Sequence, residues 1–259
     1  MSRPSQPAIA RRRELSHLLE AGRNVSTARL ADRLGVSEMT IRRDLESLAR
    51  NGQAIRCYGG AVAAGRVILE FEFDQRHRCQ LEPKRRIGEA AAAAVQKGWT
   101  VFLDTGTTTL EVARALGARA LPCTVVTSSL VVASQLWAQP QVELVLLGGR
   151  VRKGSPDLAG SGAEMMLDRL TADVAFLGAD GIDAARGSFA TDVECARVGE
   201  RMAANARRCV VAADSTKLGR SGKARVLTVE QIDELITDRD APPACVAALR
   251  RRGVKVTKV

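Results

Sequence analysis

Patterns typical of secreted, disulfide-rich or zinc-binding proteins are missing from this sequence. Its six cysteines are scattered, none forms a C-x-x-C pair, and there are only two histidines. A zinc site or a disulfide framework requires closely spaced cysteines or histidines, so we expect neither. Unpaired cysteines fit a reducing cytoplasm, and we predict a cytoplasmic protein without a metal ion or a cofactor.

Long apolar runs and repeats are missing as well. No apolar run reaches the length of a membrane-spanning helix, so we expect no membrane partner. Residues 1–8 are polar and contain proline, which favours a loose tail over a signal peptide. No internal repeat is found, and the one low-complexity stretch is the alanine run 90–94.

Acidic residues are the minority among the charged ones. The chain has 39 lysines and arginines against 29 aspartates and glutamates, a net charge of +10. An excess of positive charge favours a polyanionic partner, although charge alone is weak evidence. With 259 residues, the chain is long enough for one small and one larger domain.

The stretch 26–50 has the pattern of two short helices joined by a tight turn. Ser26 is a good N-cap, apolar residues follow it at helical spacing as far as Leu34, and Gly35 can end the helix. Ser37 can cap a second helix with an apolar stripe at Ile41, Leu45 and Leu48. Two helices joined by so short a turn form a helix-turn-helix, whose second helix enters the major groove of DNA.

The start of the second helix and the segment after it would contact the DNA. Arginine can bridge guanine O6 and N7, and threonine can contact the thymine methyl group. Residues 53–57, a turn at 58–60 and residues 61–63 have the pattern of a β-hairpin, a wing that reaches phosphates or the minor groove. The predicted DNA-contacting residues are Ser37, Glu38, Met39, Thr40, Arg42, Arg43, Arg56 and Tyr58. The alternatives are a purely structural helical hairpin and a protein-docking module, which the paired arginines disfavour.

The remainder of the chain has the pattern of an α/β domain. Residues 64–83 have poor periodicity and are predicted to be a linker, which gives a DNA-binding domain over 1–63 and a second domain over 84–259. From Lys84 onward helices alternate with short apolar strands, predicted at 99–103, 123–127, 142–147, 174–177, 209–212, 235–237 and 254–256, with a further one around Val226. Continuous apolar strands alternating with helices indicate an open parallel sheet covered on both faces.

Polar or glycine-rich segments follow five of these strands, at 104–109, 127–129, 148–150, 178–181 and 214–217. In open parallel sheets ligands bind beyond the carboxyl ends of the strands. Residues 104–109, Asp-Thr-Gly-Thr-Thr-Thr, run into a helix whose free N–H groups and positive dipole end suit a phosphate. Each segment alone could be an ordinary turn, but together they predict a polar, phosphorylated ligand.

Both halves resemble one family. The N-terminal domain of the DeoR family of bacterial repressors closely resembles the stretch LADRLGVSEMTIRRDLESLARNG and the YGGA wing of this chain. The C-terminal sensor domain of the same family resembles six further stretches of this chain, FLDTGTTTLEVARAL, TVVTSSL, LLGG, AFLGADGID, ADSTKLGR and LITD. The resemblance implies a fold similar to ribose-5-phosphate isomerase and an effector that is a sugar phosphate or a related metabolite. The effector-binding residues that it implies are Lys84, Asp104, Thr105, Gly106, Thr107, Thr108, Thr109, Thr127, Ser128, Asp180, Gly181, Asp214 and Lys217.

Two positions depart from the family pattern. Ser128 stands where the family often has asparagine, and Gly199 stands where it usually has a lysine. Loss of that cation leaves open which anion is bound, and Arg197 or Arg201 could replace it.

We predict a DNA-binding regulator, a repressor of a carbohydrate or polyol catabolic operon that a phosphorylated sugar or polyol releases from its operator. We expect a homodimer or homotetramer, because one winged helix recognises few base pairs. The alternative is an enzyme similar to a sugar-phosphate isomerase with an appended DNA-binding domain, with Asp180 and Asp183 as candidate bases. Since no catalytic constellation is recognisable, we predict that the protein is not an enzyme.

Overall fold

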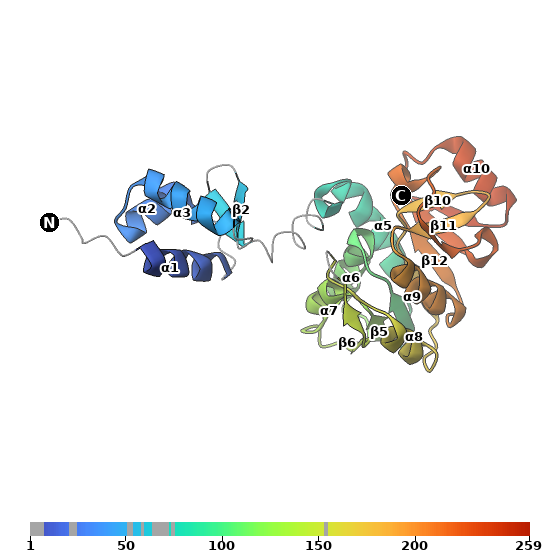
Figure 1. Cartoon of the computed structure of the whole chain (residues 1–259). Coiled ribbons are helices and arrows are strands. Elements are labelled where there is room, and N and C mark those ends of the chain that lie inside the picture. The colour runs from blue at the N-terminus through green and yellow to red at the C-terminus, as the bar shows by residue number, and fades with distance from the viewer. Residues whose placement is uncertain are drawn as a thin grey trace. The chain divides into compact units, whose positions relative to one another are not determined.

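A computed structural model describes residues 8–20, 25–50, 54–57, 60–63, 73, 76–152 and 155–259 of the chain (Figure 1). The chain divides into two compact units, Met1–Asp74 and Gln75–Val259. The division falls within the segment 64–83 that the sequence indicates as a linker.

The described residues 8–63 of the first unit form three helices and a small antiparallel sheet, the predicted helix-turn-helix with its hairpin. A short strand, β1, pairs with β3 and was not predicted, because two residues carry no periodicity. The sheet order is β1-β3-β2. The elements are α1 (Ala8–Glu20), β1 (Val25–Ser26), α2 (Thr27–Leu34), α3 (Glu38–Arg50), β2 (Ala54–Cys57) and β3 (Gly60–Ala63).

The helix-turn-helix is held by its caps and by one apolar cluster. The Ser26 hydroxyl accepts the Arg29 N–H at 3.3 Å, and Gly35 ends α2 with a φ of 63°, which glycine adopts without strain. The apolar stripes of α2 and α3 meet α1 in a core of Leu15, Leu30, Ala31, Leu34, Ile41, Leu45 and Leu48.

Two arginines of α1 bind a buried aspartate of α3. Arg11 Nε donates to Asp44 Oδ2 at 2.6 Å, and Arg12 Nε donates to Asp44 Oδ1 at 2.9 Å. Arg11 and Asp44 are both buried. In the sequence these arginines counted only as part of the positive charge, but the structure shows that they fix α1 against the second helix of the motif.

The second unit is built on a seven-stranded sheet in which every neighbouring pair is parallel. Its order is β15-β14-β12-β9-β4-β5-β6. The strands are β4 (Thr100–Leu103), β5 (Cys123–Thr127), β6 (Val142–Leu146), β9 (Val174–Leu177), β12 (Cys209–Ala212), β14 (Glu234–Thr237) and β15 (Lys255–Lys258).

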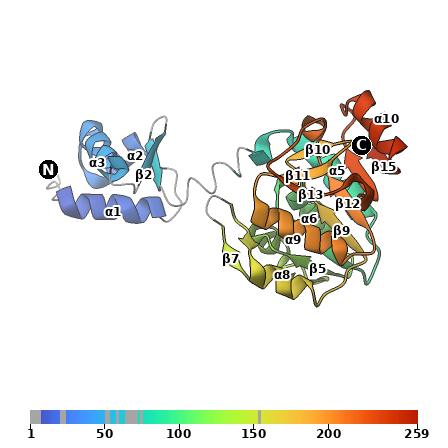
Figure 2. The same ribbon diagram turned by 45° about the vertical axis from the view of Figure 1, so that its right-hand side comes forward.

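Helices cover both faces of this sheet, as predicted. One face packs against α5 (Leu81–Ala93), α6 (Thr107–Arg119) and α7 (Leu130–Leu136). The other packs against α8 (Ser161–Leu167), α9 (Val193–Ala204) and α10 (Pro243–Arg251), and Figure 2 shows α8 and α9 lying across it. Neighbouring strand residues such as Val101 and Phe102 belong to the two different cores. None of the helices in the described ranges is long and apolar enough to span a membrane.

Short antiparallel pairs and two 3-10 turns were not predicted. β7 (Arg150–Val151) pairs with β8 (Leu158–Ala159), and β10 (Gly181–Asp183) pairs with β11 (Gly187–Ala190). The strand expected around Val226 is β13 (Ala224–Leu227), which pairs with β11 outside the large sheet. The 3-10 turns are η1 (Ser215–Lys217) and η2 (Val229–Gln231).

The second unit begins earlier than the predicted boundary at Lys84. Residues 76–78 are helical, and α5 begins at Leu81. Pro83 lies in the first turn of α5, where its missing N–H has no helical partner to lose. The Lys84 ammonium donates to the carbonyls of Arg76 and Cys79 at 2.5 and 2.6 Å, so these residues belong to the fold of the second unit.

We predict that fragment 75–259 folds by itself and that fragment 82–259 is less stable. The shorter fragment lacks both carbonyl partners of the buried Lys84 ammonium, and a buried polar group without partners costs roughly 1–3 kcal/mol. Thermal unfolding followed by circular dichroism measures the difference. A matched pair of fragments carrying Lys84→Met should differ less in stability, and the remaining difference reflects other contacts that the shorter fragment lacks, among them the bond between His77 and the buried Glu111. Equal stability of the two unsubstituted fragments would contradict the prediction.

Candidate functional site

The connections of the large sheet reverse direction between β4 and β9. From β4 the chain proceeds through β5 to the β6 edge, and it then returns to β9 on the other side of β4. Such a switch point leaves a crevice at the carboxyl ends of the two strands, where open α/β sheets bind ligands. Asp104 follows β4 and Gly178 follows β9, and the Gly178 N–H donates to Asp104 Oδ2 at 3.1 Å.

The loop after β4 presents the N-terminus of α6 to this crevice. Gly106 caps the helix with a φ of 137°, a backbone conformation that glycine adopts readily. The first helical bond runs from the Leu110 N–H to the Gly106 carbonyl at 3.1 Å. The N–H groups of residues 107–109 therefore precede the helical bonding pattern and form the kind of donor set that binds anions.

The hydroxyl groups of this loop differ in their accessibility. Thr105 and Thr107 are half-buried, whereas Thr108 and Thr109 are buried. The Thr109 hydroxyl donates to the Gly106 carbonyl at 3.1 Å, so it serves the first turn of the helix. Thr105 and Thr107 are the threonines whose side chains a ligand can reach most easily.

Burial raises the pKa of Asp104 to about 7, and the negative charges of Asp157 and Asp180 add to the effect. Hydrogen bonds from the backbone N–H groups of Thr105 and Gly178 act in the opposite direction. Near neutral pH this carboxyl group is therefore divided between its neutral and its charged form, and it can donate or accept a hydrogen bond.

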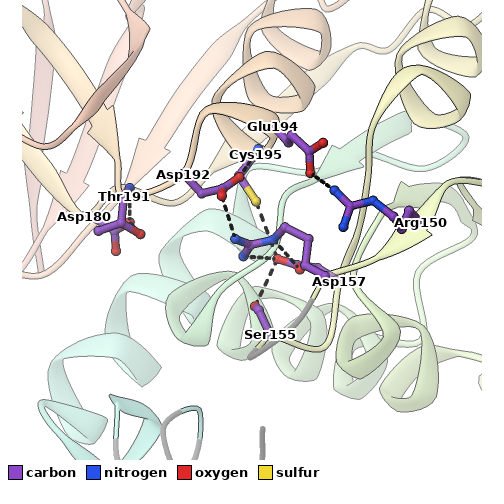
Figure 3. A network of polar contacts seen from close by, with 9 residues as sticks. Arg150, Ser155, Asp157, Asp180, Thr191, Asp192, Glu194 and Cys195 are labelled. Carbon is purple, nitrogen blue, oxygen red and sulfur yellow. Dashed lines mark hydrogen bonds and ion pairs between the residues drawn. The ribbon is translucent and has the colours of Figure 1, made fainter.

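Asp157, which interacts electrostatically with Asp104, lies at the centre of a buried ionic cluster. Figure 3 shows this cluster. Asp157 is completely buried and accepts two hydrogen bonds from Arg152, at 2.8 and 2.9 Å. The Ser155 hydroxyl and the Cys195 thiol also point to Asp157, at 3.1 and 3.7 Å. Burial raises the pKa of the Cys195 thiol, and the charge of Asp157 adds to this shift, so the sulfur stays protonated.

The loop after β5 lies beside this cluster. The Ser128 carbonyl accepts the Leu158 N–H at 2.8 Å, which fixes the loop against β8. The Thr127 hydroxyl accepts the Ser129 N–H at 3.1 Å. Thr127 and Ser128 are both buried, so the structure places the predicted residues of this loop at the carboxyl edge but beneath its surface.

Asp180 and Gly181 follow β9 with different surroundings. Asp180 Oδ2 accepts the N–H and the hydroxyl of Thr191, at 2.9 and 3.1 Å. Gly181 is buried, and a Cβ atom there would lie 2.7 Å from the carbonyl oxygen of Arg220. The close approach of two backbone segments is therefore sufficient to explain this glycine.

Lys84, Asp214 and Lys217 interact electrostatically after β12. Burial lowers the pKa of Lys84, and the charge of Asp214 counteracts this shift. Asp214 is buried and accepts the Thr216 N–H at 3.1 Å, which caps η1. Lys217 is half-buried, so among these three residues it has the side chain that is most accessible to a ligand.

The predicted DNA-contacting residues at the start of α3 lie on its exposed side. Met39 is 58% exposed, and Arg42 and Arg43 are exposed as well. The Ser37 hydroxyl caps α3 by accepting the Thr40 N–H at 3.2 Å, and Glu38 bonds with Arg42 at 3.3 Å. Arg56 lies in β2 with only its backbone described, and Tyr58 lies outside the described residues.

Family models match both units of the chain. The DeoR-like helix-turn-helix domain matches residues 11–67, and the DeoR C terminal sensor domain matches residues 79–239. The chain belongs to the DeoR family. As a member of this family with a helix-turn-helix, it is a DNA-binding transcriptional regulator.

Individual proteins resemble this DeoR-family chain over most of its length. The HTH-type transcriptional regulator GlpR of Haloferax volcanii is 36% identical and covers 88% of this chain and 89% of its own. The glycerol-3-phosphate regulon repressor of Escherichia coli K12 is 29% identical and covers 87% and 88%. Among solved structures, ribose 5-phosphate isomerase A of Methanocaldococcus jannaschii is 22% identical, with a TM-score of 0.41 over 54% of this chain and 55% of that one.

Gly199, where the family resemblance led us to expect a lysine, lies in a tightly packed place in this chain. It lies in α9, and a Cβ atom there would come within 2.8 Å of Val226 Cγ1 in β13. A lysine at this position would therefore require the Val226 side chain or one of the two elements to shift. Arg197 and Arg201 are the two arginines that could replace the expected lysine. Arg197 is exposed, and Arg201 bonds with Asp168 at 2.8 Å.

Sequence reasoning missed Arg152, Asp157 and Cys195 in this DeoR-family site. The segment after β6 indicated only glycines and Arg150, which the structure pairs with Glu194 at 2.5 Å. One feature of the sequence could have indicated this cluster: Asp157 is an acidic residue in a segment that returns to the edge of the sheet. Arg152 follows β7 directly and Cys195 lies in α9, and the periodicity of the sequence cannot show that these segments meet.

We predict that Asp104→Asn removes a pH-dependent loss of stability. The pKa of Asp104 in the folded protein, about 7, exceeds its ordinary value of 3.8, so the folded state binds the extra proton between these values. The free energy of unfolding therefore falls as pH rises toward 7, by at most about 1.4 kcal/mol per pH unit from this group. Thermal unfolding between pH 5 and pH 8 measures it.

The matched control for this experiment is Asp240→Asn, which removes the same charge from an exposed position. It should keep the pH dependence of the wild type. If Asp104→Asn also kept it, the carboxyl group would not titrate in this range.

Proposed function

We propose that this DNA-binding regulator is a repressor of a carbohydrate or polyol catabolic operon and that a phosphorylated sugar or polyol releases it from its operator. One observation carries the proposal: the Thr-Gly-Thr loop at the N-terminus of α6 lies at the switch point of the sheet, beside carboxyl groups, in a chain with a helix-turn-helix. The first feature suits an anion and the second suits hydroxyl groups.

The N–H groups of the loop and the neighbouring carboxyl groups can bind different parts of one small ligand. The N–H groups of residues 107–109 would bind the phosphate, and Gly106 lets the backbone approach it. A charged carboxylate would repel that phosphate, but the raised pKa of Asp104 makes its neutral form available. Asp104 and Asp180 would bind hydroxyl groups, and Lys217 would add a cation. The relative named as a glycerol-3-phosphate regulon repressor supports a ligand of this class.

A route from the ligand to the linker runs along α6. The same helix that begins at the Gly106 loop has Glu111 buried in its second turn. Glu111 bonds with His77 at 2.6 Å and with Arg114 at 2.8 Å, and His77 lies just after the start of the second unit. A ligand that shifts α6 would thereby move the segment that leads to the DNA-binding unit. Ligand and DNA would then favour different positions of this segment, so each would weaken the binding of the other.

We further propose that the regulator acts in the cytoplasm as a homodimer or homotetramer. A winged helix recognises one half-site, and two-fold operators are matched by two-fold proteins. The rival proposal is an isomerase-like enzyme, which requires a base over the substrate carbon. Incubation with ribose 5-phosphate and related esters separates the two: the repressor releases its operator and forms no product.

We predict that Arg43→Ala weakens operator binding by roughly 1–3 kcal/mol, the loss expected for a bidentate base contact. Arg42→Ala should act more weakly, because this arginine also bonds with Glu38, and a lost phosphate contact would lower the salt slope by about one. Affinity is measured at several salt concentrations. The control is Arg207→Ala, an arginine 84% exposed in the second unit. Wild-type affinity and salt slope in both variants would show that this side of α3 does not face DNA.

We predict that Gly106→Val and Thr107→Ala retain operator binding and lose the response to the effector. A side chain at the φ of 137° of Gly106 strains the loop, and Thr107→Ala removes a hydroxyl donor. Loss of a hydrogen bond to a charged group should raise the glycerol 3-phosphate or ribose 5-phosphate concentration for half-release roughly tenfold or more. Release of labelled operator is titrated with each ester.

The control for the loop variants is Ser134→Ala, which removes an exposed hydroxyl from α7. It should respond like the wild type. An unchanged response in Gly106→Val would exclude this loop and leave residues 214–217 as the next candidate for the phosphate.

A further inference from the structure

The two edges of the large sheet differ in the way they face solvent. At one edge β15 has the sequence Lys-Val-Thr-Lys, and both lysines are exposed. Lysines on an edge strand oppose pairing with another chain. At the other edge β6 has the sequence Val-Glu-Leu-Val-Leu, and its single charged side chain, Glu143, accepts a hydrogen bond from Thr124 at 3.0 Å. This edge lacks the protection that the chain gives to the opposite one.

Charge is also missing from the surroundings of β6. No charged residue occurs between Arg119 and Glu143, in a chain of which 26% is charged. That stretch includes α7 and Trp137, whose ring is 76% exposed just before the strand. Leu146, the last residue of the strand, is 39% exposed. Met166 of α8 is 36% exposed, and its sulfur lies 3.0 Å from the nitrogen of Gly148, which follows the strand. We name Trp137, residues 142–146 and Met166 the β6 edge surface.

The backbone of β6 has one set of polar groups that points away from β5. The Cys123 N–H donates to the Gln141 carbonyl, and the Leu147 N–H donates to the Thr127 carbonyl, so odd-numbered residues bond with β5. Residues 144 and 146 therefore direct their N–H and C=O groups outward. Within the described part of the chain, β6 has no neighbouring strand on that side.

An antiparallel copy of β6 with a two-fold axis at Leu144 can bond with the N–H and C=O groups of Leu144 and with the Leu146 N–H, whereas the Val142 N–H already donates to the Gln139 carbonyl at 3.1 Å. Leu144 then faces its own copy as a hydrogen-bonded pair, and Val142 faces Leu146 of the second copy. Glu143 faces Val145 of the second copy, so no like charges are opposed. A two-fold axis at Glu143 would instead place two carboxylates face to face.

We propose that the β6 edge surface is the interface between two copies of this chain, which join their sheets into one continuous sheet. Two copies with a net charge of +10 repel each other, so they associate at least cost where charge is absent. A nucleic acid would need cations here, and the described residues of this surface include none. A self-complementary strand with a two-fold axis has the form of an isologous dimer contact.

The test is the mass of the full chain in solution, with Trp137→Arg and Leu146→Pro as variants. The wild type should have twice its 27.7 kDa mass or a multiple of that. Trp137→Arg places like charges in the contact. Leu146→Pro removes an N–H that points away from β5, a position where an edge strand tolerates proline. Each should raise the dissociation constant at least tenfold, which corresponds to about 1.4 kcal/mol.

The control is Ala247→Arg, which adds the same charge at an exposed position of α10 and should keep the wild-type mass. A tetrameric wild type should fall to dimers in both edge variants. Circular dichroism confirms that each variant is folded. A monomeric wild type, or folded edge variants with the wild-type mass, would overturn the proposal.

A second measurement does not depend on substitution. Amide hydrogen exchange of Leu144 and Leu146 should slow as the protein concentration rises, because pairing covers these N–H groups. The amide of Lys255, on the opposite edge strand, should exchange at the same rate throughout. Concentration-independent exchange at Leu144 and Leu146 in an associated wild type would place the interface elsewhere. The outcome is independent of which effector the regulator binds.

Discussion

The parallel direction of all seven strands is the constraint on which the second unit depends. Because every strand of the large sheet runs the same way, all loops that follow a strand meet at one edge. The reversal between β4 and β9 marks the place along that edge where open α/β sheets bind ligands. Asp104 is drawn into this place by the Gly178 N–H, and the N-terminus of α6 follows two residues later. The site is thus a consequence of topology before it is one of particular side chains.

In both units a buried aspartate is neutralised by arginines, although the two folds differ. Asp44 is held by Arg11 and Arg12, and Asp157 is held by Arg152 with help from a hydroxyl and a thiol. Removing one partner of such a pair leaves an uncompensated buried charge, which is far more costly than the pair itself. Within the described part of the chain Asp104 forms no ion pair, and burial instead raises its pKa. The difference separates two carboxylates that are neutralised by arginines from one that is not.

Periodicity in the sequence was sufficient for the elements with long apolar patterns. The stripes that end at Leu34 and Leu48 belong to helices with the predicted bounds to within a few residues, and the apolar strands lie in the predicted sheet. It could not reveal β1, β7 or β10, because a strand of two or three residues is decided by its partner. It could not bring Arg152, Asp157 and Cys195 together either, since their contact depends on how three separate segments pack. Tyr58 lies outside the described residues, and the roles assigned to the other site residues remain predictions.

The Lys84 ammonium group holds two backbone carbonyls and also lies close enough to Asp214 to interact with its charge. An ammonium has three N–H bonds, and two of them are directed to the carbonyls of Arg76 and Cys79. At most one is left for Asp214 or for an anion beyond η1. Any ligand that drew the ammonium fully to itself would have to release the turn at the start of the second unit. A ligand that bound this ammonium would therefore compete with the two carbonyl contacts that hold the first residues of the second unit.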